Sequence, residues 1–236
     1  MIYNGFIKPK GAVNMDKIKL MDHVVKTMKE KKGFQGTLKA EAKRDQTTIF
    51  HIDREFAKDG ETGVAKVKSE AELNFDGKTV KRESNTEINL KDFDETQHPA
   101  LMRLIRWRQG MRFGGFKEGL NKLGFFLNLL NSAHLEERED HSYSLSLSMD
   151  GFPEEIREII QERMDRRELG PYFENSPLQE LAKKIQSVGD LTIKMNMVIN
   201  KDFEVERIVR EFSGKLKDET NTEHQWNMNT ELSLAW

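Results

Sequence analysis

The stretch FGGFKEGLNKLGFFLNLLNSA, residues 113–133, decides the fold that the sequence leads us to expect. Its apolar residues recur in steps of three and four, which places them on one stripe of a helix: Phe113, Phe116, Leu120, Leu123, Leu127 and Leu130. Phe125, Phe126 and Leu129 widen the stripe, and so apolar a helix is stable only when protein surrounds it. The glycines inside this stretch each lower helix propensity by about 1 kcal/mol relative to alanine. Packing must therefore hold this helix together.

Strand patterns come before this stretch. Apolar and polar residues alternate over residues 37–44, 48–57, 63–75 and 80–90. Asp59–Gly60 and Asp76–Gly77 are tight-turn signals between these runs, so an antiparallel meander is expected. A helix is predicted before the meander, from Met15 to Lys31, and residues 1–14 are predicted to form a flexible arm.

More strands and helices are expected after the central stretch. Residues 141–149 alternate apolar side chains with serines, which predicts a strand with one buried face. Helices are expected over Ala100–Met111, 154–168 and 178–188. Three strands close the chain, and they carry apolar residues at alternate positions, among them Ile193, Met195, Met197, Trp226 and Met228.

Together these patterns predict an α+β fold. We expect a curved antiparallel β-sheet of about eight strands, an open half-barrel, with helices covering its concave face. Residues 15–236 are expected to form a single domain, with helical insertions at about 98–134 and 153–188.

Composition and motifs argue against several functions. The formal net charge is −2 and the pI is near 6.3, whereas a dedicated nucleic-acid binder usually has a strong basic excess. The chain has no cysteine, and its histidines show no metal-ligand spacing, so neither a metal site nor a cofactor is predicted. Phosphate-loop and nucleophile-elbow motifs are absent as well. We therefore expect a protein that is not an enzyme.

Two parts of the sequence resemble a known family. They are MDHVVKTMKEKKGFQGTLKAEAKRD at 21–45, and LTIKMNMVINKDFEVERIVREFSGKLK at 191–217 with the terminal WNMNTELSLAW at 226–236. With the expected order of elements, they resemble the bacterial lipoprotein-carrier superfamily, the LolA/LolB/LppX-like lipoproteins. The resemblance implies an extracytoplasmic protein of the cell envelope, often lipid-anchored, whose curved sheet presents an apolar concave face to lipid. A chain that truly starts at Met1 would instead be cytoplasmic, because it has neither a leader nor an anchoring cysteine.

The resemblance also implies a site for a lipid or another apolar ligand, between a helical lid and the wall of the sheet. Methionine and phenylalanine suit such a site because their side chains adapt to irregular apolar shapes. Peripheral contact with a membrane surface stays open as an alternative, and no protein partner can be named. The expected lid residues are Phe113, Phe116, Leu120, Leu123, Phe126 and Leu130. The expected wall residues are Tyr143, Leu145, Leu147, Met195, Met197, Trp226 and Met228.

An alternative function stays open. The same residues could form a solid core, because apolar stripes belong to cores more often than to cavities. The protein would then be a structural or interaction domain of the bacterial cell envelope that holds no ligand. Bound lipid would favour the first hypothesis, and a phenotype caused only by surface substitutions would favour the second.

Overall fold

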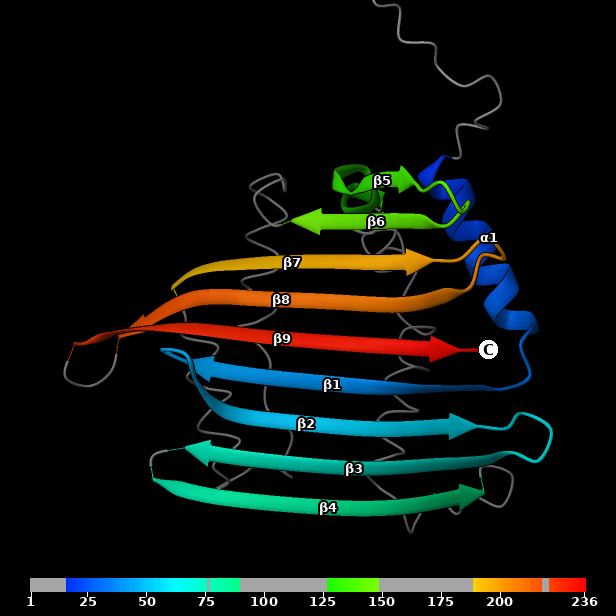
Figure 1. The fold of residues 1–236 in the computed structure, drawn as a ribbon. Coiled ribbons are helices and arrows are strands. Elements are labelled where there is room, and N and C mark those ends of the chain that lie inside the picture. Colours follow the sequence, from blue (N-terminus) through cyan, green and yellow to red (C-terminus); the bar gives the residue numbers. More distant parts are fainter. Residues whose placement is uncertain (1–15, 76, 90–126, 149–188, 218–220) are drawn as a thin grey trace, which may run out of the picture.

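The computed structural model describes residues 16–75, 77–89, 127–148, 189–217 and 221–236. Nine strands form one sheet in the order β4-β3-β2-β1-β9-β8-β7-β6-β5, and all neighbours pair antiparallel (Figure 1). The elements are α1 (Lys17–Glu30), β1 (Phe34–Arg44), β2 (Thr47–Lys58), β3 (Val64–Phe75), β4 (Lys78–Asn89), β5 (His134–Glu137), β6 (Tyr143–Ser148), β7 (Gly189–Ile199), β8 (Val205–Lys217) and β9 (Glu223–Ala235).

Two meanders make up the sheet. One runs from β1 to β4 and the other from β5 to β9, and the last strand of the chain joins them by pairing with β1. The junction has a regular register, in which Leu38 faces Leu232 and Ala40 faces Thr230. The alternating runs that predicted strands correspond to β1–β4, β6 and β7–β9, whose ends differ from the predicted ends by a few residues.

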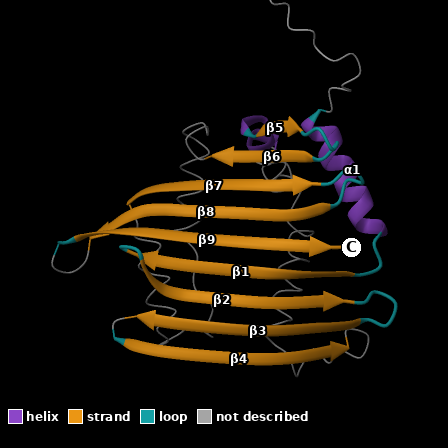
Figure 2. Cartoon of the chain, viewed as in Figure 1, coloured by secondary structure: helices purple, strands orange, loops and turns teal. Residues whose placement is uncertain are grey.

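The fold class expected from the sequence is wrong. The described residues are mostly strand, with helix only in α1 and in residues 127–132 (Figure 2). α1 packs at one end of the sheet, so the described part is a broad nine-stranded sheet rather than a helix-covered half-barrel. Helical periodicity identifies a helix but does not say where it packs, and this limit explains the error. The helices expected at 100–111, 154–168 and 178–188, and most of 113–133, lie outside the described residues.

α1 is joined to the sheet by a small core. The Asp16 side chain caps the helix by accepting a hydrogen bond from the Ile18 backbone N–H at 3.3 Å. Leu20 and Val24 are almost fully buried, because they lie one turn apart on the stripe that faces the sheet. This stripe packs against side chains at the ends of β6, β7 and β8, namely Tyr143, Ile199 and Val205. The second meander thus packs against α1.

The turn between β7 and β8 is tied to the end of α1. The Asn200 side chain accepts hydrogen bonds from the backbone N–H groups of Asp202, at 3.0 Å, and Glu204, at 2.9 Å. Its amide also donates to the Glu204 carboxylate at 2.8 Å, and Lys31 forms an ion pair with the same carboxylate. Glu204 therefore connects the residue that follows α1 to the β7–β8 turn.

The connection through Glu204 predicts a pH-dependent stability. The Lys31 ammonium and the Asn200 amide hold the pKa of Glu204 below its ordinary value of 4.5. Because the folded-state pKa is the lower one, the stabilisation is full above the unfolded-state pKa and is lost as pH falls through the folded-state pKa. We expect Glu204→Gln to lower the free energy of unfolding by about 1 kcal/mol near neutral pH.

Urea denaturation of both proteins near pH 7 and near pH 3 tests this expectation. The difference in stability between the two proteins should narrow at the acidic pH, since the stabilisation by the carboxylate is lost as pH falls from the unfolded-state pKa through the lowered folded-state pKa. An equal difference at both pH values would show that the effect of the substitution does not come from the carboxylate.

Candidate functional site: the apolar face of the sheet

Strand register divides the side chains of the sheet between two faces. Residues that stand directly opposite each other on paired strands point to the same side, and so do residues two apart on one strand. One side, which we call the apolar face, is formed by the side chains of two central rows and their neighbours. From β3 to β6 these rows are Ser69, Arg54, Leu38, Leu232, Ile208, Met197 and Leu145, and Ala71, Ile52, Ala40, Thr230, Arg210, Met195 and Leu147.

The wall residues predicted from the sequence all lie on the apolar face. Tyr143, Leu145 and Trp226 are buried, and the other four are half-buried. The register brings them together from three strands: Tyr143, Leu145 and Leu147 on β6, Met195 and Met197 on β7, and Trp226 and Met228 on β9. Their shared face follows from alternation within each strand, whereas their role as ligand contacts stays a prediction.

The predicted lid is mostly outside the described residues. Phe113, Phe116, Leu120, Leu123 and Phe126 lie there, and Leu130 alone of the predicted set is described. Leu130 is buried within the helical residues 127–132.

Four arginines of the described strands lie on the apolar face: Arg44, which stands directly opposite Trp226 and has an interaction partner, and three others. Arg54 is half-buried on β2, while Arg82 on β4 and Arg210 on β8 are exposed. The Arg54 Nε atom is buried and has no hydrogen-bond partner. No described residue forms an ion pair or a hydrogen bond with any of the three guanidinium groups, and no aspartate or glutamate of β1–β4 or β9 lies on this face. Among the described residues, Arg54, Arg82 and Arg210 therefore have no carboxylate directly opposite them on a paired strand.

Arg54 has polar neighbours on one side only. Ser69 stands directly opposite it on β3 and is buried, and Ser84 stands opposite Ser69 on β4. On the other side it faces Leu38 of β1. We call Arg54, Ser69 and Ser84 the arginine notch. The notch presents a guanidinium and two hydroxyls at the margin of an apolar surface.

On the opposite face, which we call the polar face, cationic side chains form ion pairs with carboxylates of neighbouring strands. Lys81 pairs with Glu72 at 2.9 Å, Lys66 with Glu87 at 3.2 Å, and Arg207 with Glu231 at 2.7 Å. The Arg207 guanidinium holds the pKa of Glu231 below its ordinary value, and Glu231 in turn raises the pKa of Arg207. Partners on neighbouring strands thus neutralise these cations of the polar face, whereas Arg54, Arg82 and Arg210 on the apolar face have no such partner among the described residues.

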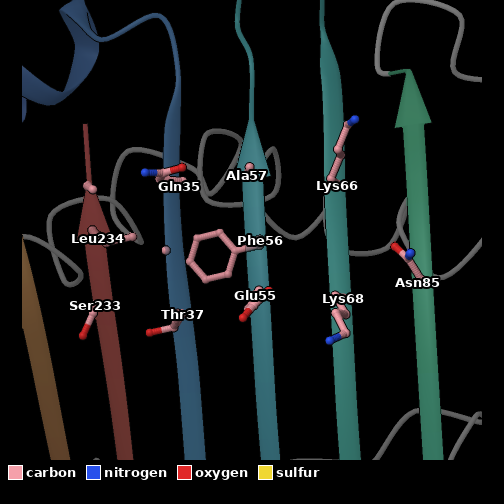
Figure 3. Close-up of a pocket in the computed structure, with 12 residues that line it drawn as sticks. Gln35, Thr37, Glu55, Phe56, Ala57, Lys66, Lys68, Asn85, Ser233 and Leu234 are labelled. Atoms are coloured by element: carbon pink, nitrogen blue, oxygen red, sulfur yellow. The ribbon is translucent and has the colours of Figure 1, made fainter.

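Three hollows of the described surface are lined mainly by residues of the polar face, although three predicted wall residues, Leu147, Met195 and Met228, also line two of them. One of about 510 Å³ spans β9, β1, β2, β3 and β4. In Figure 3 its lining includes polar-face side chains such as Thr37, Glu55 and Lys68, and the Phe56 ring lies beside β1. Two smaller hollows, of about 400 and 330 Å³, share Lys194 and Glu211 on the same face. These hollows do not enclose the wall residues as a set, so the expected apolar cavity stays a prediction.

Two absences concern only the residues that the structure describes. In that part of the chain no group of three or more histidine, aspartate or glutamate side chains could hold a metal ion. No helix there is long and apolar enough to cross a membrane.

The arginines of the apolar face were missed in the sequence, although the sequence contains a signal for them. In β2 the apolar phase runs Phe50, Ile52, Arg54 and Phe56, so the arginine occupies a position that the pattern reserves for an inward side chain. Arg210 holds the same kind of position on β8, between Ile208 and Phe212 on alternate residues. A charge in the apolar phase of a strand is the observation that would have identified them.

Comparisons with known proteins do not assign the chain to a family. No family model matches it, and no curated protein matches it. Among solved structures it is similar to a bifunctional dehydratase-cyclase domain in ambruticin biosynthesis, with 9% identity over 93% of this chain and 79% of that chain, and a TM-score of 0.16. It is also similar to an N-terminal dehydratase from the difficidin assembly line, with 9% identity over 92% of this chain and 84% of that chain, and a TM-score of 0.13.

TM-scores this low establish neither a shared fold nor a shared activity. Both neighbours therefore leave the expectation that the chain is not an enzyme as a prediction. The resemblance to the lipoprotein-carrier superfamily also stays a prediction, because no comparison bears on it.

Proposed function

We propose that this chain is a binding module that holds an anionic amphiphile, such as a fatty acid or an anionic phospholipid, against the apolar face. The proposal is one of binding rather than catalysis. The observation that carries it is that Arg54, Arg82 and Arg210 lie on the apolar face and have no carboxylate partner in the described part of the chain. An amphiphile supplies what such a surface lacks, since its tail covers apolar side chains and its head group pairs with a guanidinium.

Arg54 is the residue best suited to hold the head group. Its guanidinium offers several donors in a planar fork that matches a carboxylate or a phosphate. Partial burial strengthens the ion pair, because fewer water molecules screen it than at the exposed Arg210. The neighbouring hydroxyls of Ser69 and Ser84 can donate further hydrogen bonds to the same anion.

The tail would lie across the strands next to the arginine notch. β2 and β8 are three strand spacings apart, which is about 14 Å at the usual separation of strands. From β2 toward β8 the row that contains Arg54 is apolar, with Leu38 on β1, Leu232 on β9 and Ile208 on β8 itself. Met197 and Met195 follow on β7, and their flexible side chains suit tails of different shape.

Titration with a fluorescent long-chain fatty acid tests the proposal. We expect Arg54→Gln to weaken binding of the acid by roughly 10- to 100-fold, because a charge-assisted hydrogen-bonded pair is lost. Arg207→Gln is the matched control, since it removes an arginine that Glu231 already neutralises on the polar face. This control should bind the acid within about twofold of the wild type.

A fatty alcohol of the same chain length separates the contribution of the head group from that of the tail. The wild type should bind the alcohol about as weakly as Arg54→Gln binds the acid. Circular dichroism establishes that each variant is folded. Equal binding of acid and alcohol by the wild type, or unchanged binding by Arg54→Gln, would contradict the proposal.

The location that goes with this function is the bacterial cell envelope, as the resemblance to lipoprotein carriers implies. Peripheral contact with a membrane surface would give the apolar face access to lipid. Both statements belong to the proposal and are tested by fractionation of cells that express the natural gene.

A further inference from the structure

One edge of the sheet is the long strand β4, which pairs only with β3 among the residues that the structure describes. β4 has 12 residues, and it pairs with β3 along its whole length in an uninterrupted register. It ends the strand order of the sheet and forms the lower edge in Figure 1. All of its residues except Ile88 are exposed, including Val80, which is 47% exposed. Proteins usually shorten, kink or cover such an edge, because its unpaired backbone groups can bind another strand.

The sequence of β4 is complementary to itself. We propose that β4 pairs antiparallel with β4 of a second copy of this chain, about a two-fold axis through Ser84, so that the two sheets continue into each other. In this register Lys81 faces Glu87 of the second copy, and Val80 faces Ile88 of the second copy. By symmetry each contact occurs twice, and each residue stays on the same face as its partner.

The proposed contacts extend rows that already exist within one copy. On the polar face Lys81 pairs with Glu72, and Glu87 pairs with Lys66. Joining the copies gives a row of alternating charge across the junction, from Glu72 through Lys81 to Glu87 and Lys66 of the second copy. Opposite charges on directly facing residues stabilise strand pairing.

The apolar face gains a matching row. Val80 stands opposite Leu73 within its own sheet, and Ile88 stands opposite Ala65. Pairing the copies therefore covers the exposed Val80 with an isoleucine and continues the apolar row across the junction. The apolar faces of the two copies would lie on the same side of the joined sheet.

Neighbouring registers are less favourable. An axis through Glu83 places that glutamate against itself, and an axis through Asn85 places Glu83 against Glu87 twice. An axis through Arg82 places two arginines in contact. Like charges that face each other directly destabilise strand pairing, and a shift by one residue would turn the apolar face of one copy toward the polar face of the other. The charge pattern of β4 thus selects the axis at Ser84, and a second copy of this chain is the partner that fits it.

Sedimentation equilibrium of the full chain tests this inference. The wild type should show a reversible monomer–dimer equilibrium. Lys81→Glu and Glu87→Lys should each weaken dimerisation at least about tenfold, because each places two pairs of like charges at the junction. Lys201→Glu is the control: it makes the same charge reversal in the exposed β7–β8 turn and should leave the dimer unchanged.

Mixing the two variants gives the decisive result. Lys81→Glu carries carboxylates at both positions of the charged contact, and Glu87→Lys carries ammonium groups at both. In a mixed pair every charged contact therefore joins a carboxylate of one variant to an ammonium of the other, so dimerisation should return to near the wild-type level. A wild type that stays monomeric, variants that dimerise as well as the wild type, or a mixture that stays monomeric would each overturn the proposal. This outcome does not depend on ligand binding, so it is independent of the proposed function.

Discussion

Leu20→Ala is expected to lower the free energy of unfolding by about 2–5 kcal/mol, the usual range for removing a fully buried leucine side chain. Leu20 is completely buried, and with Val24 it forms the contact of α1 with Tyr143, Ile199 and Val205. Truncation would leave a cavity between the helix and three strands. The surrounding residues can close it only partly, because the strands are fixed by their ladder.

Urea denaturation followed by circular dichroism measures this loss. Ile18→Ala is the matched control in the same helix, where the side chain is 51% exposed, and it should change stability by no more than about 0.5 kcal/mol. If the two substitutions cost the same, α1 is not packed on the sheet by the stripe that contains Leu20.

Gly36→Ala is expected to destabilise the protein by about 1–3 kcal/mol, through crowding rather than through a cavity. An added Cβ would lie 2.3 Å from the backbone oxygen of Ser233 and 2.8 Å from a ring atom of Phe56. The ring can turn, but the oxygen belongs to β9, which pairs directly with β1. The two strands would have to separate locally, at the place where the two meanders join.

Thermal unfolding compares this variant with Thr37→Ala at the next position, where the side chain points to the polar face. We expect a clear fall in melting temperature for the glycine variant and little change for the threonine variant. A stable Gly36→Ala protein would indicate that β1 and β9 are less closely paired than the structure describes.

Alternation predicted the strands well because a two-residue period follows directly from the geometry of a half-buried strand. It could not predict that β1 pairs with β9, since many apolar strands are compatible partners and the choice depends on the whole sheet. The half-barrel with covering helices was wrong for a similar reason. The spacing of Phe113 to Leu130 describes one side of a helix and contains no information about what that side contacts.

In the candidate site, too, the features that follow from alternation within a strand could be predicted, and those that depend on pairing between strands could not. The shared face of Tyr143, Met195 and Trp226 follows from alternation once the order of the strands is known. The arginine notch depends on pairing across strands, because Arg54 and Ser69 are brought together by the register of β2 and β3. Sequence alone could place Arg54 in an apolar phase, but it could not provide the serine beside it.

Native mass spectrometry of freshly purified protein, followed by organic extraction and lipid analysis, tests the central claim most directly. We expect discrete adducts that extract as an anionic lipid or fatty acid, that are lost in Arg54→Gln and that remain in Arg207→Gln. A single ligand-free mass for the wild type, with no uptake of an added fatty acid, would contradict binding of an amphiphile on the apolar face.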